Sequence, residues 1–429
     1  MTAEDPHRRG GKWLPSDSDV QRRWLSDRAA EVAKRPEPFH PVIADFERFI
    51  ESDARAFMLF NQMFEQVPRK ALYDKEPAAL RQVRDYKTML QLLNAIVTRA
   101  PEYDRTGVVG IPINAILDWS MGTEAGYAAF LDEKVNAHLR VILDEWGRFL
   151  KSPASCAVLN DDPRKGWFGE DAIHDMPDFD RDFVCDPGAP HRGFASWDDF
   201  FTRRFRPGVR AVASPDDDDV IVNPCESAPY RLAHGVAERD RFWIKGQPYS
   251  LAHMLAGDSL APQFVGGSVY QAFLSALSYH RWHSPVSGTV VKACLRPGTY
   301  YSEPPAEHAD PATPDVSQGY ISHVATRAMI FIRADNPALG LICFMPVGMA
   351  EVSTCEIGVY EGQHIAKGEE IGMFHFGGSS FCLLFRPNVA IDFDLQGQKP
   401  GLHSSNIPVC GRLAKVNTGR NPSARGADK

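Results

Sequence analysis

Three short stretches in the C-terminal half of the chain carry side chains that suit acid–base or nucleophilic chemistry. His280 and His283 stand three residues apart in SYHRWHSP. An imidazole has an ordinary pKa of about 6.5, so it can both take and give a proton near neutral pH. Glu226 lies in NPCES, and Ser379 follows two glycines in GMFHFGGSSF. The histidine pair favours proton transfer, although two structural histidines would give the same pattern.

The glycine pair before Ser379 allows backbone conformations that other residues rarely adopt. The serine hydroxyl could then approach the carbonyl group that precedes it. A tight turn between two strands has the same composition. The nucleophile elbow of serine hydrolases, G-x-S-x-G, needs a glycine two residues after the serine, and Phe381 stands there. The stretch therefore leaves open a plain turn or a serine that acts on its own chain.

Metal binding has little support in the sequence. Zinc needs a third and a fourth ligand at recognisable spacing, and the two histidines have none nearby. The eight cysteines show no C-x-x-C spacing, so we expect free thiols and no disulfide framework. The acidic run at 216–219 is interpreted as a solvated loop. We therefore predict no metal.

Length and charge limit the class of protein. The chain has 429 residues, 44% of them hydrophobic and 24% charged, which is ordinary for a globular protein of two domains. Lys+Arg 47 against Asp+Glu 55 gives a net charge of −8, which disfavours nucleic acid as a partner. No apolar run reaches the length of a membrane span, and the N-terminus lacks the apolar core of a secretory signal. We therefore expect a cytoplasmic protein without a membrane span.

The patterning along the chain predicts an α+β protein, with a helical N-terminal region followed by a β-rich catalytic domain. Apolar residues recur at helical spacing up to the proline at 153, and short β runs between turn residues follow after about 190. The runs MIFIR and LICFM are predicted to pair as a hairpin, and a short helix is expected near 250–255. The predicted parts are a mobile leader (1–40), a helical domain (41–153), a connector (154–190), the catalytic domain (191–416) and a disordered tail (417–429).

Four motifs taken in order give a resemblance. SWDDFFTRRFRP is followed by NPCES, then by YHRWH at 279–283, then by FGGSS at 376–380. Their order over about residues 190–416 resembles the phosphatidylserine decarboxylase family, and more closely its soluble branch of aromatic amino acid decarboxylases. The expected fold is that family's catalytic domain. Three departures stand out: Glu226 in NPCES replaces the aspartate of the P-A-D-G segment of most lipid-acting members, Ser380 replaces the threonine of the G-G-S-T motif, and the V-G-x-x-x-V-G-S-I stretch is altered to VGMAEVSTCEI.

The resemblance implies a self-cleaving enzyme. Such a chain cuts itself between Gly378 and Ser379, and the serine becomes a pyruvoyl group, so neither pyridoxal phosphate nor a metal is needed. Glu226 stands where the family has a triad aspartate, and with His283 and Ser379 it would form a carboxylate, imidazole and hydroxyl set. His280 is the expected proton donor to the substrate, and His283 could share that role after cleavage, so the division of roles between the two histidines stays open. The partners would be a small amino acid substrate and the chain's own α and β fragments.

The substrate expected from the resemblance is an aromatic L-amino acid, with tryptophan first. Trp282, Phe376 and Phe381 flank the motifs and could form the walls of its pocket, although aromatic residues beside strands are commonly core residues. The Pro-rich stretch 300–320 is either an inert loop or a lid. Three alternatives stay open: decarboxylation of phosphatidylserine to phosphatidylethanolamine, a serine hydrolase with an uncut chain, and a non-catalytic binding module.

Overall fold

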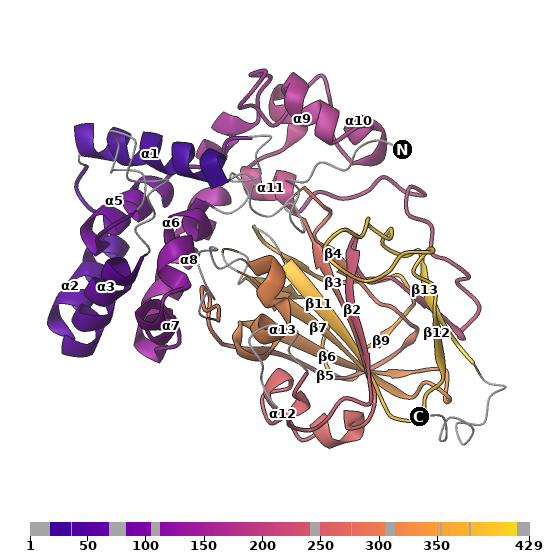
Figure 1. Ribbon diagram of the computed structural model, residues 1–429. Helices are drawn as coiled ribbons and strands as arrows, with labels where there is room; N and C mark the ends of the chain where they lie inside the picture. Colours follow the sequence, from indigo (N-terminus) through magenta and orange to yellow (C-terminus); the bar gives the residue numbers. More distant parts are fainter. Residues whose placement is uncertain are drawn as a thin grey trace.

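The computed structural model describes residues 18–35, 37–67, 83–103, 112–240, 249–275, 277–304, 314–349, 351, 354–376 and 379–417. Indigo and purple helices form the N-terminal part, and the orange and yellow strands of the C-terminal part lie beside them (Figure 1). Short helices connect the two parts along the chain. The prediction of an α+β fold with an N-terminal helical region is confirmed.

Helices form the described portion of the N-terminal part: α1 (Ser18–Lys34), α2 (Pro41–Ser52), α3 (Ala54–Gln66), α5 (Tyr86–Ile96), α6 (Pro112–Met121), α7 (Glu124–Phe130) and α8 (Glu133–Leu150). Local signals set their ends. Asp53 Oδ1 accepts the first free N–H groups of α3, and the Asp132 side chain does the same for α8. Helix α1 lies within the stretch predicted as a mobile leader, and its Leu25 is buried.

Short helices lie in the predicted connector (154–190) and just beyond it: η3 (Pro153–Val158), α9 (Glu170–Asp175), α10 (Phe179–Asp182), η4 (Pro190–Gly193) and α11 (Trp197–Phe201). Phe168, Phe179 and Phe200 pack against one another there, with ring centroids 5.7–5.9 Å apart. They belong to the same buried cluster as Trp146 of α8. The connector is therefore packed onto the helical part, while the limits predicted for the domains remain predictions.

The C-terminal part is built on an antiparallel sheet in the order β2-β3-β11-β7-β6-β5-β9. Its strands are β2 (Ala228–His234), β3 (Ser268–Leu274), β5 (Gly288–Arg296), β6 (Arg327–Ala334), β7 (Leu341–Gly348), β9 (His364–Ile365) and β11 (Ser379–Phe385). Two three-stranded sheets accompany it: β4 (Arg281–His283), β8 (Cys355–Ile357) and β10 (Glu370–Phe374), and β1 (Val220–Val222), β12 (Ile391–Phe393) and β13 (Arg412–Val416). The predicted hairpin is confirmed as β6 and β7.

Strand β11 is buried on both faces of the large sheet. Successive side chains of a strand point to opposite faces. Phe381 and Leu383 belong to one core cluster, which also contains side chains of β4 and β10, whereas Cys382 and Leu384 belong to a second cluster with α12 (Leu251–Met254) and α13 (Pro314–Val324). Helix α13 lies against β11 (Figure 1). By this alternation Ser379 shares the face of β4 and β10, the strands that carry the histidine motif and precede the glycine pair.

Candidate active site

Ser379 is the first residue of β11 and lies between Leu274 of β3 and Gly348 of β7. Its side chain is fully buried, and among the described residues its Oγ has no hydrogen-bond partner. Gly377 and Gly378 lie outside the described residues. A buried polar group without a partner costs roughly 1–3 kcal/mol, so it calls for an explanation. A hydroxyl that must stay available to attack a carbonyl group provides one.

Ser380 differs from its neighbour because its hydroxyl is engaged on the opposite face of β11. Gln271 Nε2 donates to Ser380 Oγ at 2.9 Å. The same Oγ lies 3.1 Å from the carbonyl oxygen of Ala272 and 3.2 Å from Gln318 Oε1, either of which accepts its proton. The serine that replaces the family's threonine is thus a fixed structural hydroxyl, and Ser379 is the better candidate nucleophile.

His280 lies just before β4 with its side chain fully buried. Its ring stacks on the ring of Phe201 in α11, with centroids 4.1 Å apart and planes 23° apart. Its backbone carbonyl accepts a hydrogen bond from the N–H of Phe374, the last residue of β10, at 2.9 Å. His280 therefore sits between α11 and β10, the strand that leads toward Ser379.

His283 is held through both of its ring nitrogens. Nδ1 lies 2.7 Å from the carbonyl oxygen of Gly368, and Nε2 lies 2.9 Å from Tyr279 Oη. A carbonyl oxygen only accepts, so Nδ1 carries the proton and Nε2 accepts from the tyrosine hydroxyl. Burial lowers the pKa of His283 below its ordinary value, which favours this neutral ring. Nε2 is therefore the nitrogen that could act as a base, after exchange of Tyr279 for another donor.

Glu226 forms a two-point ion pair with Arg210 instead of contacting an imidazole. Its Oε1 and Oε2 accept from Arg210 Nη2 and Nε at 2.8 and 3.0 Å, and Oε2 also accepts from the N–H of Val409. The backbone N–H of His283 donates to the carbonyl of Pro224, so the two segments lie side by side. Both ring nitrogens of His283 have other partners, and among the described residues this carboxylate makes no direct hydrogen bond to that ring. The triad stays a prediction.

The three aromatic residues predicted to contact substrate lie in two different places. Trp282 is fully buried and packs edge-to-face against Phe374, with ring centroids 4.8 Å apart. Phe381 shares its core cluster beneath the large sheet. Phe376 instead packs against Trp146 of α8 at 4.5 Å, within the cluster of the helical part. Substrate contact stays a prediction for all three, and Phe376 alone among them joins the helical part to the segment before Ser379.

Glu351 is a buried carboxyl group that the sequence did not single out. It follows β7 beyond Gly348, and its Oε1 accepts the N–H of Asn114 at 2.9 Å, in the first turn of α6. Its Oε2 is buried and has no hydrogen-bond partner in the described part of the chain. Burial raises the pKa of Glu351 to about 8, against the opposing effect of backbone N–H groups. The altered stretch VGMAEVSTCEI contains this residue, but no spacing rule marks it.

In the stretch 300–320, predicted as an inert loop or a lid, residues 301–304 and 317–320 are buried and Tyr300 is half-buried. Tyr301 and Glu303 are each 2% exposed. Ser302 Oγ lies 2.8 Å from Tyr320 Oη, so the two ends of the stretch are tied together. Residues 305–313 lie outside the described residues. The two alternatives for this stretch, an inert loop and a lid, both stay predictions.

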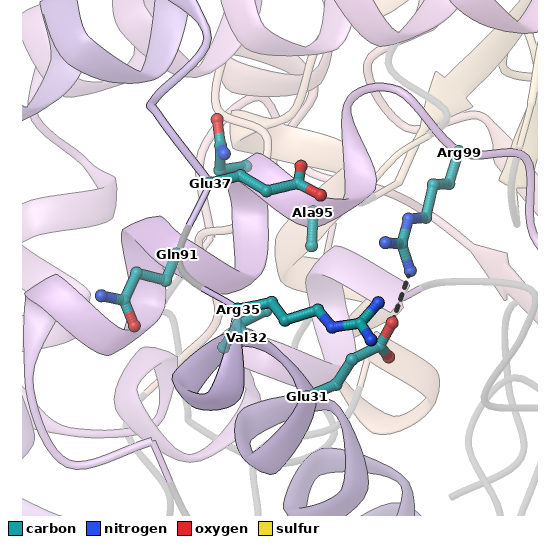
Figure 2. A pocket seen from close by; sticks show the side chains of 8 residues that line it. Glu31, Val32, Arg35, Glu37, Gln91, Ala95 and Arg99 are labelled. Carbon is teal, nitrogen blue, oxygen red and sulfur yellow. Dashed lines mark hydrogen bonds and ion pairs between the residues drawn. The ribbon is translucent and has the colours of Figure 1, made fainter.

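A surface pocket lies apart from all of these residues. It is formed by α1, α5 and the segments next to them. Two of its lining residues, Glu31 and Arg99, form an ion pair (Figure 2). Its remaining lining residues include Gln91 and Asn94. None of the predicted catalytic or substrate-binding residues lines this pocket.

Three further findings concern metals, thiols and membranes. In the part of the chain that the structure describes, no group of three or more His, Cys, Asp or Glu side chains is placed to hold a metal ion. All eight cysteines are free thiols. Within the same residues no helix has both the length and the apolar character needed to cross a bilayer.

Sequence models described as phosphatidylserine decarboxylase match the chain over residues 40–176 and 197–406. The chain is 38% identical to the L-tryptophan decarboxylase of Psilocybe cyanescens and 39% identical to that of Psilocybe cubensis. Each match covers 415 residues, 91% of this chain and 91% of the relative. The chain belongs to the phosphatidylserine decarboxylase family.

A third relative, decarboxylase iboD of Amanita muscaria (strain Koide BX008), is 46% identical over 302 residues, which cover 66% of this chain and 86% of that protein. The family and the class of enzyme, a carboxy-lyase, are thereby confirmed. The matches assign no roles to single residues.

Proposed function

We propose that the chain is a pyruvoyl-dependent decarboxylase that cuts itself between Gly378 and Ser379 and converts an aromatic L-amino acid, tryptophan first, to its amine and CO2. One observation carries the proposal: the hydroxyl of Ser379, which directly follows the glycine pair, is buried at the start of a central strand and has no partner among the described residues. Two relatives that match over 91% of their length are named L-tryptophan decarboxylase, which favours an amino acid over a lipid.

The cut exchanges bonds within the chain. Ser379 Oγ forms a bond to the carbonyl carbon of Gly378 as the peptide C–N bond breaks, so the amide becomes an ester. Loss of a proton from the Ser379 Cα then expels the Gly378 carboxylate and leaves dehydroalanine, and water replaces its nitrogen as ammonia to give the pyruvoyl group. A base must take the Oγ proton first. We assign this role to Nε2 of His283, with Glu226 as its orienting carboxylate. Nε2 must then release Tyr279, and Glu226 must take the place of the Gly368 carbonyl at Nδ1.

The buried position of Ser379 fits the group that would form there. A pyruvoyl ketone supplies an electron sink when CO2 leaves the substrate. The residues around it must exclude water and return a proton to the substrate α-carbon. His280 is our candidate donor of that proton, because its ring is buried against Phe201 and its backbone carbonyl is hydrogen-bonded to β10.

The aromatic residues before the cleavage site support an aromatic substrate. Phe376 packs against Trp146, Trp197 and Phe201, with ring centroids 4.5–5.9 Å apart. Burial of an indole or phenyl ring beside this cluster would be worth about 2–3 kcal/mol. A cytoplasmic site of action is part of the proposal, supported by the eight free thiols.

A substrate panel tests the proposed reaction. Purified protein is incubated without pyridoxal phosphate, separately with each of the twenty amino acids and with phosphatidylserine in detergent, and amine formation is measured. We expect tryptamine, or another aromatic amine, from the wild type and none from Ser379→Ala. Ser380→Ala is the matched neighbour variant and should keep measurable activity. Turnover of phosphatidylserine alone would instead favour the lipid reaction.

A further inference from the structure

His375 stands four residues before Ser379 and lies between two carboxylates. Its Nδ1 is 2.9 and 3.1 Å from the two carboxylate oxygens of Asp198, and its Nε2 is 2.7 Å from Glu356 Oε2. Only 12% of its side chain is exposed. Carboxylate oxygens accept hydrogen bonds and do not donate them when ionised, so both ring nitrogens carry protons in this arrangement. The geometry is that of an imidazolium cation between two anions.

The charged surroundings agree with that protonation state. Burial by itself would lower the pKa of His375, but its hydrogen bonds to Asp198 and Glu356 outweigh burial, and the pKa is raised. Three elements contribute charged groups: Asp198 from α11, Glu356 from β8, and Lys151 after α8, whose positive charge opposes the protonated form. The two acidic groups face the ring directly and dominate.

The three side chains join separate stretches of sequence. Asp198 lies in SWDDFFTRRFRP, Glu356 in the altered stretch VGMAEVSTCEI, and His375 in the segment that leads to Ser379. The backbone N–H of His375 donates to the carbonyl of Thr354 at 3.1 Å, which adds a main-chain bond to the same contact. The ion triplet therefore fastens this segment from two sides, at α11 and at β8.

We propose that His375 is a positioning residue for self-cleavage: its cation, held by Asp198 and Glu356, fixes the segment whose carbonyl group Ser379 attacks. The inference rests on the proposed function. Attack on a carbonyl group requires the reacting atoms to be close and correctly oriented, and small displacements of the attacked group slow the reaction strongly. After the cut this segment becomes the free C-terminal end of the β chain, and the same ion triplet, whose three residues all precede the cut, ties that end to the rest of the β chain.

The first test is the rate of self-cleavage, followed on denaturing gels after synthesis of the full chain. We expect His375→Gln to slow the cut roughly tenfold to hundredfold, because a neutral amide cannot replace an imidazolium that is hydrogen-bonded to two carboxylates. His364→Gln is the matched control: His364 also pairs with a carboxylate, Asp335, at 2.9 Å, but it lies exposed on β9. It should cut at the wild-type rate.

The second test separates a charge effect from loss of fold. A raised folded pKa means that the cationic contact is complete at low pH and is lost as pH rises through that pKa. Glu356→Gln removes one anion at a side chain that is 53% exposed, so it should fold normally. Between about pH 6 and about pH 9, we expect its loss of cleavage rate to begin at a lower pH than in the wild type. Superimposable profiles would overturn the inference.

The outcomes separate failure of the proposed function from failure of the positioning role of His375. If the wild type is never cut, the proposed function fails, and this inference fails with it. If the wild type is cut and His375→Gln is cut at the same rate, the positioning role is wrong while the proposed function stands. Circular dichroism shows whether the His375→Gln chain is folded. If that chain is unfolded, the pH profile of Glu356→Gln decides whether His375 has the positioning role.

Discussion

Replacement of Glu351 by glutamine tests the buried carboxyl group that accepts a hydrogen bond from the first turn of α6. The pKa of Glu351 is raised by burial from an ordinary value of 4.5 to about 8. One pKa unit corresponds to about 1.4 kcal/mol, so the difference amounts to a penalty of about 5 kcal/mol for the ionised form in the folded state. Glutamine keeps an oxygen that can accept from the N–H of Asn114, and it never ionises.

The sign of the effect follows from proton binding. Between pH 4.5 and about 8 the folded chain retains the Glu351 proton and the unfolded chain releases it. The folded state then binds more protons, so the free energy of unfolding falls as pH rises through this window. The stability of Glu351→Gln relative to the wild type should therefore increase with pH, by up to about 5 kcal/mol in total.

Thermal unfolding on a Ser379→Ala background, in which we expect the chain to remain uncut, gives a clean comparison. The unfolding midpoint is measured at about pH 5, about pH 7 and about pH 9 with and without Glu351→Gln, and the difference should grow toward high pH. Glu361→Gln, at an exposed turn, is the control and should show no such trend. Parallel pH curves for the two chains that differ at Glu351 would refute a buried carboxyl group that resists ionisation.

The remaining predictions concern cleavage and turnover. Either Glu226→Ala or His283→Ala should block maturation on a denaturing gel, and normal maturation with wild-type turnover in His283→Ala would refute the triad. His280→Ala should be cut normally but turn over substrate more slowly, so a block of cleavage would reassign this histidine. Ser380→Ala should still be cut, and its free energy of unfolding should be roughly 1–3 kcal/mol lower, because one of the two acceptors of the buried Gln271 amide nitrogen is lost while the Gln318 carbonyl remains. Unchanged stability on chemical denaturation would contradict that estimate.

Local patterns predicted the elements that depend on neighbouring residues. The runs that became β6 and β7 alternate with turn residues, and they pair as the expected hairpin. The apolar spacing of α8 predicted its buried face, with Leu139 and Trp146 inward. The glycine pair marked Ser379, and the structure adds the reason to choose it over Ser380, because only the second hydroxyl is engaged.

Long-range pairing could not be predicted in this way. His375 and Asp198 lie 177 residues apart in sequence, and no spacing rule links them. Glu226 was expected beside an imidazole, yet the nearest strong partner of its carboxylate is Arg210, which the motif order did not mark. Such contacts depend on how α11 and the segment after it pack against the strands, which the order of motifs in the chain does not encode.

Intact mass of the purified, active protein tests the central claim most directly. We expect two chains that meet at Gly378 and Ser379, the shorter of 51 residues and blocked to Edman degradation because it begins with a ketone. Their summed mass should show ammonia exchanged for water, whereas cutting by a contaminating protease would add a whole water. The Ser379→Ala chain should give one full-length mass. A single full-length chain from active wild-type enzyme would contradict the account.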